Sequence, residues 1–198
     1  MHEPLLAQAA LPAPVKVLGL TLKPYSLGHE LFLIREGNPL VTTAPESAKP
    51  HDIAEAALVC CQTFEECRRM HRDRWIGLKL KLWRRRIRRA DYDLARAAFL
   101  EYRNAGSIEF PLSDIARPDK PTSRAPGAPF LLRLHQFLMA KLHKTEAEAW
   151  DYPLGLAKCH WECFWESEGG LDIYNAADAE FDRFVAEQEA KAKEAVNG

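Results

Sequence analysis

The sequence lacks the short motifs by which many enzyme families are found from sequence alone. Seven histidines are present, but none lies in HExxH, and GxSxG, GxxxxGKS/T and GxGxxG do not occur. These motifs mark zinc peptidases, serine hydrolases and nucleotide-binding loops. We therefore expect a protein that is not an enzyme and that uses no cofactor.

Long apolar runs and a surplus of one charge are also missing. No window approaches the roughly 18 continuous apolar residues of a membrane-spanning helix, and the net charge of the 198-residue chain is −1. The first residues, MHEPLLAQAALPAP, lack the positive start of a signal peptide and carry prolines within their apolar part. We expect a cytoplasmic protein with no membrane contact.

The chain has five cysteines but no C-x-x-C pair, a common spacing of structural zinc ligands. Cys60 and Cys67 fall on the apolar stripe of one predicted helix, where a free cysteine packs as a small hydrophobe. Cys159 and Cys163 lie at i and i+4 of another helix and could share a metal ion. We predict reduced core thiols and no metal site, with this second pair as the alternative.

Apolar residues are plentiful and recur with helical spacing, so the sequence predicts an all-α fold. We expect a single helical domain of about six helices at 25–175, an irregular N-terminal arm or short strand at 1–24, and an acidic C-terminal helix or tail at 176–198. Within the domain, residues 107–129 contain five prolines and form a loop. The predicted helices are 26–37 with Ser26 as N-cap, 52–72, one through 76–87, 92–104, 130–144 and 145–170.

The last of these helices carries three of the five tryptophans of the chain. Thr145 and Glu148 have capping-box spacing, which predicts the helix start, and Pro153 interrupts or restarts the helix. Its apolar residues cover most sides, a pattern typical of a helix buried between others. We therefore predict that 145–170 is the central helix and that it packs antiparallel to 130–144.

Two blocks of opposite charge stand out. Arg68–Arg89 holds eleven Lys or Arg against one Asp, and Glu162–Glu194 holds ten acids against three bases. The basic block could dock on the acidic one or on a partner protein, could be a solvated helix face, or could follow a phosphate backbone with Trp75 and Trp83 stacking on bases. We favour pairing of the basic block with a partner protein or with the acidic block of the same chain, and keep nucleic-acid binding as the alternative.

Two stretches, PYSLGHELFLIREGNPLV (Pro24–Val41) and EAEAWDYPLGLAKCHWECFWESEGGLDIYN (Glu146–Asn175), resemble the tail assembly chaperones of tailed bacteriophages and prophages. The resemblance covers about a quarter of the chain. It implies a non-enzymatic tail morphogenesis protein that escorts the long helical tape-measure protein in the cytoplasm of the bacterial host. Self-association fits this role but is not required by it.

Exposed aromatic residues flanked by arginines are the residue types that dominate protein–protein contacts. We therefore place the partner-binding surfaces on the basic helix and on the charged C-terminal segment. The candidate residues are Trp75, Trp83, Arg84, Arg85, Arg86, Arg88, Phe181 and Phe184.

Overall fold

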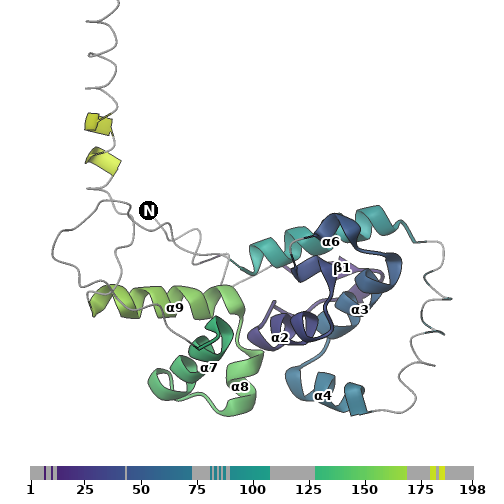
Figure 1. Cartoon of the computed structure of the whole chain (residues 1–198), viewed down its shortest axis with the longest axis horizontal. Coiled ribbons are helices and arrows are strands. Elements are labelled where there is room, and N and C mark those ends of the chain that lie inside the picture. Colours follow the sequence, from purple (N-terminus) through teal and green to yellow (C-terminus); the bar gives the residue numbers. More distant parts are fainter. Residues whose placement is uncertain are drawn as a thin grey trace, which may run out of the picture.

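The computed structural model describes most of the chain, and its fold is all-α apart from one small hairpin, as the sequence predicts (Figure 1). The described residues are 13–42, 44–72, 90–107 and 128–168, with short pieces at 7, 10, 81, 83, 85, 87, 179–181 and 183–185.

The named elements follow one another in chain order as two short strands, α-helices and two 3₁₀ turns. They are β1 (Lys16–Val17), β2 (Leu20–Thr21), α2 (Leu27–Arg35), η1 (Pro39–Val41), η2 (Pro45–Ser47), α3 (Pro50–Cys60), α4 (Phe64–Arg72), α6 (Tyr92–Ala105), α7 (Phe130–Lys141), α8 (Glu146–Asp151) and α9 (Leu154–Ser167).

The two strands form an antiparallel hairpin that packs on α6. Leu18 and Gly19, at the turn, have φ values of 50° and 80°, as a tight hairpin turn of two residues with positive φ requires. Val17 is buried, and the Tyr102 hydroxyl donates to the Lys23 carbonyl at 2.7 Å. The short strand expected in the N-terminal arm is therefore present, and it belongs to the core.

Helix α2 begins where the sequence predicts. The Ser26 hydroxyl accepts from the His29 amide at 3.3 Å, and the His29 ring accepts from the Ser26 amide at 3.2 Å. This reciprocal pair is a capping box with histidine in the place of glutamate. Helix α2 packs against α3, α4, α7 and α8. It is therefore the central helix, and the prediction that 145–170 has that place is wrong.

The start of α2 is braced against the start of α9. The Leu154 amide donates to the Tyr25 carbonyl at 2.7 Å, and the Leu27 amide donates to the Tyr152 carbonyl at 3.2 Å. At Gly28, a Cβ would lie 2.9 Å from the Phe64 ring, so the missing side chain lets α2 approach α4 closely. The two hydrogen bonds join the two stretches that carry the family resemblance.

The single helix predicted at 52–72 is wrong, because the chain forms two helices, α3 and α4, with a break at residues 61–63. The Thr63 amide donates to the Glu66 carboxylate at 2.7 Å, and the Glu66 amide donates to the Thr63 hydroxyl at 3.3 Å. This capping box starts α4. The Asp151 carboxylate accepts from the Phe64 amide at 2.6 Å and adds a second cap.

The helix predicted at 145–170 is also two helices. The capping box at Thr145 is confirmed and starts α8, and the chain starts again at Pro153 to form α9. Helix α9 is buried only in its first turns and carries exposed side chains beyond them. Phe130 meets Trp161 and Phe137 meets Phe164, so α7 and α9 run in the same direction. The predicted antiparallel packing of this pair is wrong. The chain turns back after α7 to form α8, and it turns again at Pro153 before α9.

Candidate interaction surface

Helices α7 and α9 bring together a cluster of aromatic rings at one end of the body. Trp161 meets Phe130 edge to face with ring centroids 6.4 Å apart, and Phe137 at 5.5 Å. Trp165 lies 5.6 Å from both Trp161 and Phe164. Such edge-to-face contacts are favourable, yet the cluster is not closed, because Phe130 is 39% and Trp165 is 37% exposed.

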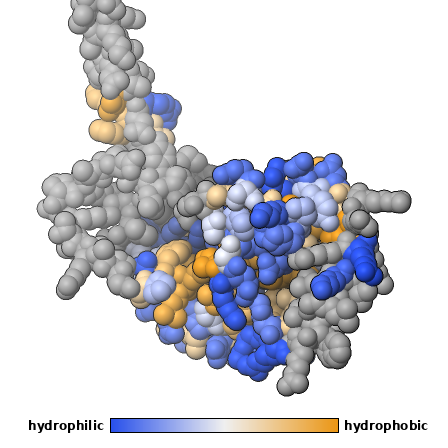
Figure 2. Space-filling model, turned by 45° about the vertical axis from the view of Figure 1, so that its right-hand side comes forward, coloured by the Kyte–Doolittle hydropathy of each residue, from blue (hydrophilic) through white to orange (hydrophobic). Residues whose placement is uncertain are grey.

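Between the two helices lies a hollow of about 370 Å³, which we call the α7–α9 groove. Figure 2 shows hydrophobic side chains gathered toward the end of the body that carries these helices. The lining is apolar apart from one glutamine and two cations, and it consists of Ala128, Leu132, Arg133, Gln136, Phe137, Ala140, Lys141, Trp161, Phe164 and Trp165.

The two cations of the groove lie over aromatic rings. The Arg133 guanidinium is 5.4 Å from the Phe130 ring centroid and 5.6 Å from that of Trp161, and the Lys141 ammonium is 4.8 Å from that of Phe164. A ring face attracts a cation but leaves its positive charge uncompensated. Within the described part of the chain, neither cation pairs with a carboxylate, and the buried Arg133 Nε has no hydrogen-bond partner. The groove therefore suits an apolar ligand that also carries acidic groups.

A second hollow, of about 760 Å³, continues the apolar surface toward α2. It shares Leu132 with the α7–α9 groove, and it includes Ile34, an exposed residue of α2. Its acid, Glu30, is already satisfied, because it pairs with Arg103 at 3.2 Å and accepts from the Tyr25 hydroxyl. This second hollow extends the surface open to an apolar partner.

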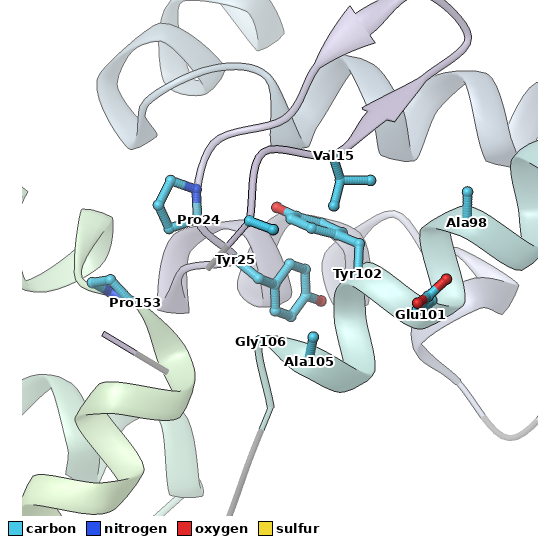
Figure 3. A pocket seen from close by; sticks show the side chains of 10 residues that line it. Val15, Pro24, Tyr25, Ala98, Glu101, Tyr102, Ala105, Gly106 and Pro153 are labelled. Atoms are coloured by element: carbon cyan, nitrogen blue, oxygen red, sulfur yellow. The ribbon is translucent and has the colours of Figure 1, made fainter. Parts of the chain in front are cut away.

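A third hollow, of about 280 Å³, lies between the hairpin segment and α6 and is lined by Tyr25 and Tyr102 (Figure 3). Both hydroxyls donate hydrogen bonds, to the Glu30 carboxylate and to the Lys23 carbonyl. Burial raises the pKa of both phenols. At Gly106 a Cβ would lie only 2.5 Å from the Cβ of Tyr25. These features are those of tight packing, so we place no ligand in this hollow.

The predicted partner-binding residues are described only in part. Trp75, Arg84, Arg86 and Arg88 lie outside the described residues. Trp83 is half-buried and packs against the core, whereas Arg85 is exposed.

Phe181 and Phe184 are 51% and 58% exposed, so both rings are accessible to a partner. The sequence reasoning missed the α7–α9 groove because it assigned Trp161 and Trp165 to the core. The available signal was the line Arg133, Phe137, Lys141, which places cations at i−4 and i+4 of an aromatic residue on one helix.

The described cysteines have the properties of neutral thiols. Burial raises the pKa of Cys67 to about 12 and that of Cys159 to about 11, and it also raises the pKa of Cys60. Metal ligation requires the thiolate, which these shifts disfavour. Among the residues whose placement is described, no group of three or more metal-ligating side chains occurs. The Cys159–Cys163 pair has no third ligand there.

No family model matches the chain, and no match is found among curated proteins or among solved structures. In the described part of the chain, no helix is both long and apolar enough to cross a membrane. The α7–α9 groove, with its half-exposed rings and the cations over them, is the candidate interaction surface.

Proposed function

We propose that this chain is a non-enzymatic tail morphogenesis protein of a bacteriophage or prophage. In this role it binds a long helical protein, such as a tape-measure protein, in the cytoplasm of the bacterial host. The observation that carries the proposal is the α7–α9 groove, an apolar hollow between two parallel helices. Its wall holds two cations that pair with no carboxylate of the described residues.

A third helix is the natural occupant of such a groove. An amphipathic helix places apolar side chains at i, i+3 or i+4, and i+7 into the space between two helices. Tryptophan and arginine, which dominate the energetics of protein interfaces, are both present in the lining as Trp161, Trp165 and Arg133. The positive charges of Arg133 and Lys141 favour a partner helix with acidic residues beside its apolar face.

The family resemblance supports the same part of the molecule. Its second stretch, Glu146–Asn175, contains α9 and therefore one wall of the groove. Its first stretch, Pro24–Val41, contains α2, which is braced to the start of α9 by the Leu154–Tyr25 and Leu27–Tyr152 hydrogen bonds. The resemblance thus follows a structural unit rather than two unrelated segments.

Nucleic-acid binding by 68–89 has weaker support. Base stacking needs an aromatic face that is open to the ligand, and Trp83 is half-buried against the core. No cluster of exposed rings accompanies Arg85 among the described residues, whereas the α7–α9 groove combines cations with half-exposed rings.

The test is co-expression of the full chain with the tape-measure protein of the genome that encodes it. We expect a complex that stays intact through affinity purification and size-exclusion chromatography. The double variant Trp165→Ser/Leu132→Ser should weaken this complex at least about tenfold, equivalent to about 1.4 kcal/mol of binding free energy. Leu94→Ser is the matched control, because Leu94 is an exposed leucine on α6 that does not line the groove.

Three outcomes would contradict the proposal. The gene could lie far from any tail gene, the tape-measure protein could fail to co-purify, or the double variant could bind as well as the control. Tight binding to a short DNA duplex that is lost between about 50 and 200 mM salt would instead support the nucleic-acid alternative.

A further inference from the structure

The C-terminal segment carries a second set of exposed aromatic residues. Phe181, Phe184 and Val185 are exposed and stand at i, i+3 and i+4. Around them, residues 176–198 hold six acids and three bases, a net charge of −3. Apolar anchors at helical spacing with acidic neighbours are the features that the α7–α9 groove favours in an occupant.

The charges of the groove and of this segment are complementary. The groove lining contains Arg133 and Lys141 and no acid, while Phe181 has Glu180 and Asp182 on either side in the sequence. Opposite charges at the rim of an interface fix orientation and register more than they add affinity. The two phenylalanines would supply most of the apolar contact.

The connection between the two parts is long enough for this contact. Helix α9 ends at Ser167, two residues after Trp165 in the groove wall. The ten residues 169–178 connect Glu168, directly after α9, to Ala179, and ten residues can span at most about 36 Å. A segment tethered this closely reaches an effective concentration of the order of millimolar, far above that of a free second copy in a cell.

We propose that residues 179–185 of this chain occupy its own α7–α9 groove when no partner is bound, with Phe181 and Phe184 as the anchors. In Figure 1 the described residues 179–181 and 183–185 are drawn apart from α7 and α9, so the proposed contact is not present in this arrangement. The partner helix then competes with the segment, so the segment regulates access to the groove. This inference rests on the proposed function, since it assigns a competitor to the same site.

The test uses the full chain alone, without any partner, and carries a photoreactive benzoyl-phenylalanine in place of Phe184. On illumination we expect cross-links to peptides from 128–141 or 154–167 at the mass of the monomer. Lys141→Glu changes an exposed side chain of the groove and should lower the cross-linking yield several-fold. The same photoreactive residue in place of Leu94 is the control, and it should give no cross-link to these peptides.

Three results would each overturn the inference. They are cross-links to residues 68–89, cross-links at the mass of a dimer only, and no cross-link within the chain. A second measurement separates this failure from failure of the proposed function. The variant Phe181→Ser/Phe184→Ser should bind the tape-measure protein several-fold more tightly than the unaltered chain, because the competitor is lost. Equal binding by the two would overturn the inference and leave the proposed function intact. Weaker binding by the variant would also overturn the inference, because Phe181 and Phe184 would then contact the partner directly, as the sequence predicts.

Discussion

Two regions of the molecule use aromatic side chains at helical spacing in opposite ways. On α6, Phe99 is 0% exposed and packs against Tyr102, whose hydroxyl is bonded to the Lys23 carbonyl. On α9, Trp165 is 37% exposed, and the neighbouring rings carry cations on their faces. The same residue types therefore form the core where their polar neighbours are hydrogen-bonded. They mark an interaction surface where the rings stay exposed to water and cations lie over them.

The largest effect expected from this difference is in stability. Phe99→Ala removes a fully buried ring and should lower the free energy of unfolding by about 3–5 kcal/mol. Trp165→Ala removes a larger ring that is partly exposed to water, and it should cost about 1 kcal/mol or less. Urea unfolding of both variants, followed by circular dichroism, measures the two losses. Equal losses would mean that α9 belongs to the core and that the groove is no docking surface.

The starts of helices were the most predictable feature of this fold. Ser26 and Thr145 each cap a helix at the residue that the sequence indicates, and Asp91 caps α6 directly before the predicted helix 92–104. A cap is a contact between residues two or three apart, so its sequence signal is local. The break between α3 and α4 carried the same kind of signal in Thr63 and Glu66. This signal was overlooked because the apolar stripe continues across the break, and a continuous stripe predicts a single helix.

The candidate site was much less predictable. The apolar pattern of α9 is that of a buried helix, but burial depends on which other elements cover a face. Helix α9 packs mainly against α7, whereas α2 is surrounded by four helices. Nothing in the local sequence tells how many neighbours a helix has. For that reason the exposure of Trp165 could not be predicted from the sequence, although the sequence does show the aromatic and cationic residues that line the groove.

The second prediction concerns the pH dependence of stability, through the buried histidine at the start of α2. His29 is buried, its Nδ1 accepts from the Ser26 amide, and its Nε2 lies 2.8 Å from the Gln62 carbonyl. The proton is therefore on Nε2, and a second proton on Nδ1 would break the cap of α2. Burial, the largest influence, lowers the pKa of His29 below its ordinary value, and the contact with the Gln62 carbonyl opposes the shift only in part.

The sign of the effect follows from proton linkage. Below about pH 6.5 the unfolded chain binds a proton at this histidine more readily than the folded chain does, so stability falls as the pH falls. The free energy of unfolding should be steady between about pH 7 and pH 8 and decrease toward pH 5, by less than the loss in Phe99→Ala. His29→Gln should reduce this slope but not abolish it, because burial also lowers the pKa of His160. Urea unfolding at each pH measures the slope. An unchanged slope in His29→Gln would contradict the conclusion that protonation of His29 destabilises the fold.

The smallest expected effect on stability is that of a substitution in the α7–α9 groove. The same substitution can be used to compare a loss in stability with a loss in binding. Lys141→Met keeps an apolar stem of similar length but removes the ammonium from the face of Phe164, 4.8 Å away. We expect a loss of only about 0.5 kcal/mol in the free energy of unfolding. Lys49→Met, at an exposed lysine before α3, should cost nothing measurable.

If Lys141 serves a partner with acidic groups, the same substitution should weaken that complex by more than it weakens the fold, because the contact with the acid is lost in addition to the contact with the ring. Binding of the co-expressed tape-measure protein to Lys141→Met, compared with Lys49→Met at two salt concentrations, measures this excess. A loss in binding no larger than the loss in stability would show that the cation only covers the ring. The open rings of α7 and α9 would then differ from the closed ones of α6 in exposure alone.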